Sequence, residues 1–149
     1  MSEISSYQTR ISIPSLAKRT RLKGNIIDQE PRGALIKRAL ELIAEDHDGE
    51  ITSEIQDCDG KTIPCLLGVS TPQCPKGVGV VVDKGGNVSF VYDAYGDNKG
   101  WGRKIAGEIS ANYNAIATRM ALQNMNFEVT TQNCRTSQGQ RLIKLEGSV

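Results

Sequence analysis

Residues 78–92 read VGVVVDKGGNVSFVY, and this stretch decides the fold. The valine run at 78–82 and the apolar run at 88–92 have the length and the β-branched or aromatic content of strands. Residues 84–87, Lys-Gly-Gly-Asn, lie between them and supply the conformations that a tight turn needs. The stretch therefore predicts an antiparallel hairpin.

A long amphipathic helix is predicted downstream of this hairpin, after a loop that ends near residue 100. Apolar residues recur at helical spacing on one face: Ile105, Ile109, Tyr113, Ile116, Ala117, Met120 and Ala121. The pattern then changes to a strand at 127–131, a polar turn over 135–140 and a strand at 142–145, which predicts a final hairpin.

The first half of the chain predicts a strand, a helix and another strand pair. Residues 4–13 alternate loosely in polarity and end at Pro14. Pro31 is well placed to begin a helix that ends near Glu45. Its apolar face is expected to hold Leu35, Ala39, Leu42 and Ile43.

Two strands, 50–57 and 62–69, follow this helix and form a hairpin. A two-residue turn is too short to connect them in register. A two-residue turn at Asp59-Gly60 would place Ile63 and Cys65 on the face that carries Glu54. We therefore expect a longer or bulged loop. Residues 70–77, STPQCPKG, hold two prolines and predict an irregular linker between the two halves.

Together these elements predict a single α+β domain over residues 1–149, with an antiparallel sheet of five or six strands and two main helices packed on one face. Each helix is followed by a short strand ending in cysteine and a turn, at 54–58 and at 130–134. This echo suggests two helix-plus-hairpin halves, 1–72 and 77–149.

Composition and charge exclude several classes of protein. Eighteen basic and 17 acidic residues leave a net charge of +1, unlike the strongly basic balance of a dedicated nucleic-acid binder. The N-terminal residues lack a basic segment followed by an apolar run, and no stretch reaches the length of a membrane span. We expect a cytoplasmic protein with no membrane partner.

Residues that suggest chemistry do not form a familiar site. Cys58, Cys65 and Cys74 are spaced too widely for the close pairs of zinc or iron–sulfur sites, and Cys134 lies far away, so we expect no metal and no cofactor. The one histidine, His47, is expected to be a solvated turn residue. The glycines at 77–86 match neither the phosphate-binding loop nor the dinucleotide fingerprint.

Two segments are candidates for binding. Residues 92–101, YDAYGDNKGW, hold the only tryptophan and two of the four tyrosines, so Tyr92, Asp93, Tyr95 and Trp101 are candidate protein-binding residues. The packing interpretation is that Tyr92 ends a strand and Trp101 fastens the helix to the sheet. The second segment is basic and contains no acid: Lys18, Arg19, Arg21 and Lys23 are candidate nucleic-acid contacts.

The order of the elements resembles one family. The residues that carry the likeness are the strand pair 80–82 and 90–93, the loop ending at Trp101, the helix segment Asn112-Tyr113-Asn114-Ala115 and the closing RLIKL at 141–145. Over residues 77–146 the chain resembles the uncharacterised conserved hypothetical chloroplast reading-frame family of cyanobacteria, red-algal plastids and bacteria. The resemblance implies a protein partner such as an AAA+ ATPase, and it supplies no catalytic residues.

The leading functional expectation is a non-enzymatic adaptor or assembly subunit that uses the loop at 93–101 and a sheet edge, with self-association as a further option. The first alternative is a nucleic-acid-associated accessory protein that uses the basic segment. The second is a small hydrolase or redox enzyme, which would need Asp93, Asp97 or the cysteines to converge in a cleft.

Overall fold

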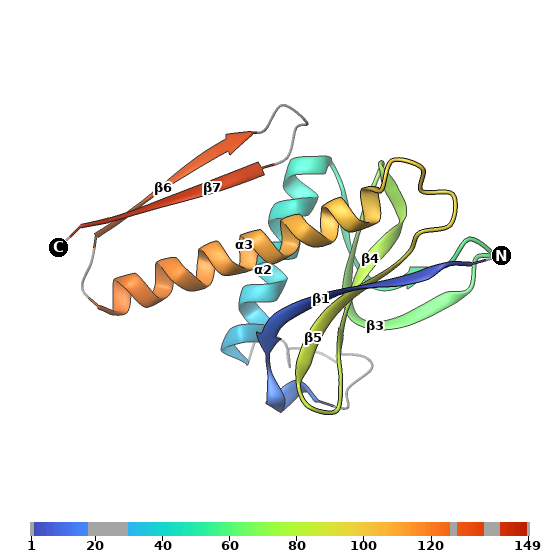
Figure 1. Ribbon diagram of the computed structural model, residues 1–149, viewed down its shortest axis with the longest axis horizontal. Helices are drawn as coiled ribbons and strands as arrows, with labels where there is room; N and C mark the ends of the chain where they lie inside the picture. The colour runs from blue at the N-terminus through green and yellow to red at the C-terminus, as the bar shows by residue number, and fades with distance from the viewer. Residues whose placement is uncertain (1, 18–29, 126–127, 136–140, 149) are drawn as a thin grey trace.

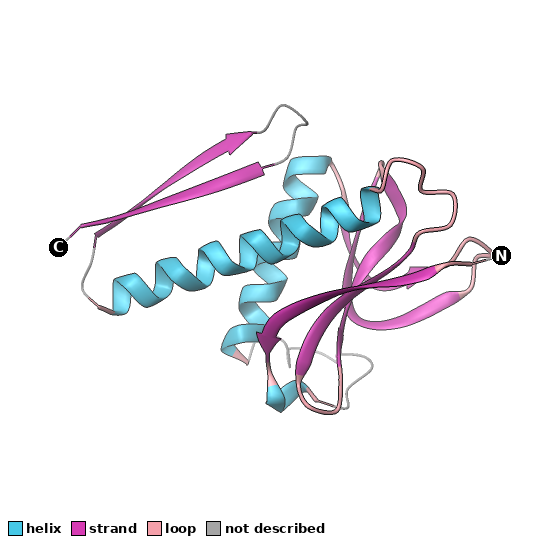
Figure 2. Ribbon diagram, in the orientation of Figure 1, coloured by secondary structure: helices cyan, strands magenta, loops and turns pink. Residues whose placement is uncertain are grey.

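The computed structural model describes residues 2–17, 30–125, 128–135 and 141–148. It has the predicted α+β architecture, with a five-stranded antiparallel main sheet and two long helices (Figures 1 and 2). The elements are β1 (Ile4–Ser12), η1 (Pro14–Leu16), α2 (Pro31–His47), β2 (Glu50–Gln56), β3 (Thr62–Thr71), β4 (Cys74–Val82), β5 (Asn87–Asp93), α3 (Trp101–Asn124), β6 (Glu128–Arg135) and β7 (Arg141–Ser148).

The main sheet has five strands in the order β1-β5-β4-β3-β2, and every neighbouring pair is antiparallel. The predicted hairpin at 78–92 is confirmed as β4 and β5, with Val80 opposite Phe90. The predicted final hairpin is also confirmed, as a separate two-stranded sheet of β6 and β7 that lies beside the C-terminal part of α3 (Figure 1). Of its predicted turn at 135–140, all but Arg135 lies outside the described residues.

The two helices pack on each other and on the same face of the sheet, as predicted. The core between them is mostly aliphatic, with Phe90, Tyr92 and Tyr113 as its buried aromatic residues. Its most buried side chains are at most 1% exposed: Ile36, Leu40, Ile43, Val80, Val88, Phe90, Ile105 and Ile109. Burying side chains of this kind is the main source of stability for such a fold.

The predicted apolar faces of both helices need correction. In α2 the buried face holds Ile36 and Leu40, whereas Leu35 and Leu42 are only half-buried. In α3 the predicted stripe continues past the sheet, so that Met120 is 45% exposed. The physical reason is length, because α3 extends well beyond the sheet that covers its first turns (Figure 1).

The prediction of an irregular linker at 70–77 is wrong. β3 continues to Thr71 and β4 begins at Cys74, and these two residues are paired across a tight turn. The two prolines fit for different reasons. Pro72 lies in the turn itself. Pro75 lies near a register shift between Val69 and Thr71, where its missing N–H is not needed for the ladder. β3 and β4 therefore join the two parts of the chain into one sheet.

The expected longer loop between β2 and β3 is confirmed. Gln56 pairs with Thr62, so that Ile55 is opposite Ile63 and shares its face. Asp57 organises the loop, since its Oδ1 accepts hydrogen bonds from the N–H groups of Asp59 and Lys61, both at 2.9 Å. Gly60 supplies the positive φ of 81° in this turn.

The hairpin of β2 and β3 curls over the sheet face that the helices leave open. Ile55 lies on two glycines of β4: a Cβ at Gly77 would be 2.9 Å from its Cγ2, and one at Gly79 would be 3.3 Å from its Cδ1. Gly79 has no side chain, which lets Cys65 approach as well. This curl carries the β2–β3 loop across to the end of β5, where the candidate site lies.

Among the described residues, none of the helices combines the length and the apolarity that crossing a bilayer requires.

Candidate functional site

The loop at 93–101 connects β5 to α3 and is built from two successive turns. The N–H of Asp97 donates to the carbonyl of Ala94 and the N–H of Gly100 donates to the carbonyl of Asp97, each at 3.1 Å. Asp97 also caps α3, since its carboxylate accepts the N–H groups of Trp101 at 2.9 Å and Gly102 at 2.8 Å. A carboxylate at this position accepts hydrogen bonds from backbone N–H groups that have no partner within the helix. Its negative charge also interacts favourably with the positive end of the helix dipole.

Asp93 is the anchor of the site and is 2% exposed. Its Oδ1 accepts the N–H groups of Glu3 and Tyr95, both at 2.9 Å, and its Oδ2 accepts the N–H of Cys58 at 2.7 Å. Burial opposes its ionisation, but these three hydrogen bonds and the charge of Lys76 outweigh burial and hold the pKa of Asp93 below its ordinary value. One carboxylate thus ties together the start of β1, the β2–β3 loop and the loop at 93–101.

Trp101 is half-buried at the first residue of α3 and packs against the core. The ring of His47 meets it edge-on, with centroids 6.2 Å apart, and the Nζ of Lys104 lies 5.0 Å from the indole centroid. These contacts hold the Trp101 indole in place, in agreement with the interpretation that Trp101 fastens the helix to the sheet.

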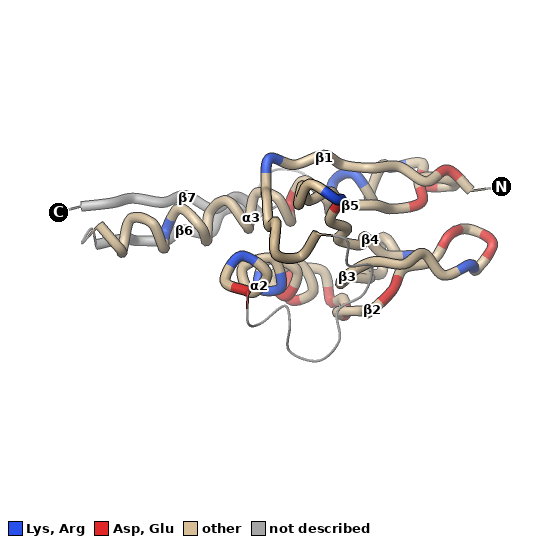
Figure 3. The backbone as a smooth tube through the Cα atoms, turned by 90° about the horizontal axis from the view of Figure 1, so that it is seen from below, with Lys and Arg blue, Asp and Glu red and all other residues tan. Residues whose placement is uncertain are grey.

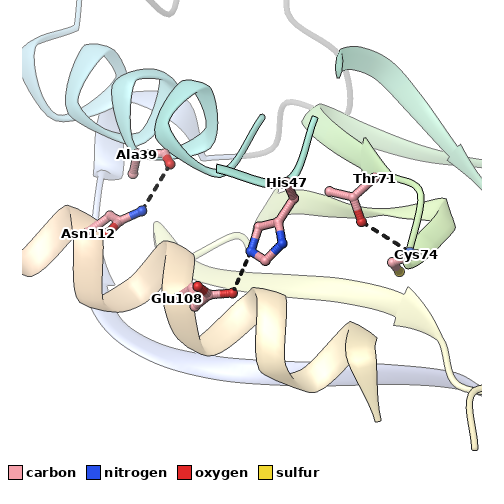
Figure 4. A network of polar contacts seen from close by, with 6 residues as sticks. All are labelled: Ala39, His47, Thr71, Cys74, Glu108 and Asn112. Atoms are coloured by element: carbon pink, nitrogen blue, oxygen red, sulfur yellow. Dashed lines mark hydrogen bonds and ion pairs between the residues drawn. The ribbon is translucent and has the colours of Figure 1, made fainter. Parts of the chain in front are cut away.

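His47 is not a solvated turn residue, so that expectation is wrong. Its Nε2 lies 3.0 Å from Oε2 of Glu108, and the two side chains are only 8% and 5% exposed (Figure 4). α2 ends at His47, two residues later than predicted, and this extra length turns the ring toward α3. A sequence signal existed, because Glu108 interrupts the buried stripe that contains Ile105, Ile109 and Asn112.

A pocket of about 380 Å³ opens between the loop and the β3–β4 turn. The loop contributes Tyr95, Asp97 and Trp101, and the strand turn contributes Cys74 and Lys76. The Nζ of Lys76 donates to the carbonyl of Tyr95 at 2.7 Å, which joins the two walls. The backbone N–H of Cys74 donates a hydrogen bond to Oγ1 of Thr71 at 3.1 Å, which holds Cys74 in place (Figure 4).

The chemical groups of this pocket are already engaged. The carboxylates of Asp93 and Asp97 accept hydrogen bonds from five backbone N–H groups. Burial raises the pKa of the Cys74 thiol, so the thiol stays protonated at neutral pH. Both carboxylates and the Cys74 backbone therefore hold the loop and the β3–β4 turn in place.

The structure brings the four candidate protein-binding residues together but gives them different exposure. Tyr92, 6% exposed, packs beneath Gly102, and Asp93 is buried. Tyr95 is 48% exposed, and Trp101 lines the same pocket. Tyr92 and Asp93 are therefore buried beneath the loop, whereas the ring of Tyr95 is exposed and Trp101 is half-buried at the pocket.

The remaining candidates are the basic segment and the other cysteines. Lys18, Arg19, Arg21 and Lys23 are outside the described residues. Cys65 is buried beside Gly79, away from the pocket. Within the described ranges, the His, Cys, Asp and Glu side chains form no cluster of metal-binding size. Sequence reasoning missed Lys76, because residues 70–77 read as a linker and gave no sign of their position beside the loop.

No protein-family model, no curated protein and no solved structure matches this chain. The fold and the surface described above are therefore the basis for inferring function.

Proposed function

We propose that this domain is a non-enzymatic adaptor or assembly subunit of the cytoplasm, and that it binds a protein partner through Tyr95, Trp101 and the pocket between them. The observation that carries the proposal is the exposed ring of Tyr95 on a loop that Asp93 and Asp97 hold in place. Aromatic side chains on rigid loops contribute large contact areas at low entropic cost, and they are enriched among the residues that dominate binding energy.

Charge around the rings supports a protein partner. Lys76, Lys99 and Lys104 surround the pocket or the indole, whereas the two carboxylates at its base are occupied by backbone donors. A partner surface that combines an apolar side chain with an acidic rim fits this arrangement. On the family resemblance, an AAA+ ATPase is the first candidate.

The hydrolase or redox alternative gains little from the geometry. Catalysis by Asp93 would need a carboxylate that a substrate can reach, and this side chain is 2% exposed. The Asp97 carboxylate is held at the start of α3 by two backbone N–H groups, which gives it a structural role. Catalysis by Cys74 would need a lowered thiol pKa, whereas burial raises it. The alternative that residues 18–23 bind a nucleic acid stays a prediction from the sequence.

The test is affinity capture from native lysate with the full chain and two matched variants. Tyr95→Ala removes the exposed ring at the pocket. Met120→Ala is the matched control, because it removes a side chain of similar exposure, 45%. Met120 lies about 28 Å from Trp101 along the axis of α3. The wild type and Met120→Ala are expected to retain the same partner, which Tyr95→Ala binds at least about tenfold more weakly. Equal capture by all three proteins, or a wild-type monomer that captures no protein, would overturn the proposal.

A further inference from the structure

β1 is an edge of the sheet, and β5 is its strand partner within the described part of the chain. The N–H of Ala94 donates to the carbonyl of Glu3 at 2.8 Å, which fixes the phase of the ladder. Hydrogen-bonded pairs alternate with pairs that are not bonded in an antiparallel ladder. The backbone N–H and C=O groups of Ser6 and Gln8 therefore point away from β5, toward the open edge.

A groove of about 560 Å³ runs between this edge and the two helices. Its wall on the β1 side includes Thr9 and Arg10, and its helix side includes Arg32 of α2 and Ser110, Tyr113 and Asn114 of α3. The lining is mostly polar. A chain added to β1 would direct alternate side chains into this groove.

The groove is positively charged. Arg10 and Arg32 line it, and the guanidinium of Arg103 lies over the neighbouring Tyr7 ring, 5.8 Å from its centroid. None of the lining residues that the structure describes is Asp or Glu. Glu30 lies nearby, but its carboxylate accepts hydrogen bonds from the N–H of Arg32 and the hydroxyl of Ser15. Figure 3 shows a basic position at the end of β1, and both basic and acidic positions along α2.

We propose that the β1 edge binds an extended acidic peptide segment of a partner protein by strand addition. The backbone groups of Ser6 and Gln8 pair with the added strand, and Arg10 and Arg32 select acidic side chains. This inference rests on the proposed protein-binding function and names the chemistry of a partner segment at a second surface, separate from the loop at 93–101.

A single-stranded nucleic acid is the competing polyanion, and the geometry disfavours it. Binding of bases needs aromatic faces on which they can stack. Tyr7 lies between Phe90, at 6.3 Å between centroids, and Arg103, which covers it. Tyr113 is only 8% exposed. Neither ring offers an open face, whereas the backbone groups of Ser6 and Gln8 that point away from β5 suit a peptide.

The experiment measures fluorescence anisotropy with the purified full chain and three probes. The probes are a peptide alternating Glu and Val, the matching peptide of Lys and Val, and a single-stranded oligonucleotide of the same charge as the Glu peptide. Wild type is expected to bind the Glu peptide at least about tenfold more tightly than the other two probes, with affinity that falls as salt rises from about 50 to about 300 mM.

Two variants test the mode of binding. Gln8→Pro removes a donor that faces the open edge, which an edge strand tolerates, and Gln8→Ala is its matched control. Both variants lose the Gln8 side chain and only Gln8→Pro loses the N–H, so Gln8→Pro is expected to bind the Glu peptide at least about tenfold more weakly than Gln8→Ala does. Arg10→Glu is expected to weaken binding of the Glu peptide and to narrow its preference over the Lys peptide, because Arg32 and Arg103 remain. Far-UV circular dichroism checks that each variant is folded.

Equal affinity of Gln8→Pro and Gln8→Ala would overturn strand addition, and tighter binding of the oligonucleotide than of the Glu peptide would overturn the choice of ligand. Tyr95→Ala is expected to bind the Glu peptide as wild type does. If capture of a partner through Tyr95 succeeds while the Glu peptide does not bind, this inference fails alone. If the peptide binds and lysate capture through Tyr95 fails, the proposed loop surface fails alone.

Discussion

The close approach of α3 to β5 at Gly102 gives a sharp prediction. A Cβ built at Gly102 would lie 2.4 Å from Cδ2 and 2.8 Å from Cγ of Tyr92. These atoms belong to the base of a buried ring, so they cannot swing aside as the end of a flexible side chain could. Gly102→Ala must therefore push the first turn of α3, with Trp101 and the loop at 93–101, away from the sheet.

The size of the effect follows from two opposing terms. Alanine is better than glycine inside a helix by about 1 kcal/mol, and by less in the first turn. Overpacking of a core costs about 1–3 kcal/mol, and a contact more than about 1 Å too short belongs at the upper end of that range. Gly102→Ala is expected to lower the free energy of unfolding by about 2 kcal/mol.

Gly107 in the same helix provides the matched control. A Cβ there would lie 3.7 Å from the hydroxyl of Tyr7, which is ordinary van der Waals contact. Gly107→Ala is expected to raise the free energy of unfolding by about 0.5–1 kcal/mol. Urea denaturation followed by circular dichroism measures both variants. A Gly102→Ala variant as stable as Gly107→Ala would refute the reasoning.

The Tyr92→Ala background provides a second check. If the clash with the ring causes the loss, Gly102→Ala should cost little once the ring is gone, and the double-mutant cycle should give a coupling energy of about 2 kcal/mol. An unchanged cost in that background would show that the ring is not the cause.

Three further predictions concern buried polar groups. The pKa of Asp93 is lower in the folded chain than in the unfolded chain. The ionised Asp93 carboxylate therefore stabilises the fold above about pH 4, and this stabilisation is lost as the pH falls through the pKa of the folded state. Asp93→Asn should therefore lower the urea midpoint at pH 7, with a difference from wild type that narrows in acid; a difference that grows in acid would contradict the assignment. Because burial raises the pKa of Cys74 above its ordinary 9.0, its iodoacetamide labelling, resolved by mass spectrometry, should still accelerate above pH 9, and a plateau below that pH would contradict the prediction. Glu108→Ala leaves the His47 ring without its hydrogen-bond partner and should lower the free energy of unfolding by about 1–3 kcal/mol in urea denaturation, more than replacing both residues with leucine does; an unchanged midpoint would argue against the contact.

Local patterns in the sequence were sufficient for most of the elements. The valine run and the Gly-Gly turn predicted β4 and β5, and the periodicity from Ile105 predicted α3, because side-chain alternation and helical spacing are properties of contiguous residues. The register conflict at Asp59-Gly60 even predicted a longer loop, because pairing the wrong faces would have buried charge. The same reasoning failed at 70–77, where prolines suggested a linker although the turn between β3 and β4 and a register shift accommodate them.

The candidate site was predicted only in part. The sequence by itself determined that Tyr95 and Trp101 share one loop after a strand, because both lie within a single connection. Only the tertiary structure decided that Lys76 joins them, that Asp93 binds the β2–β3 loop and that His47 meets Glu108. These contacts join residues distant in the chain, and they depend on how far β2 curls and where each helix ends, which packing of the whole core sets and no local pattern encodes.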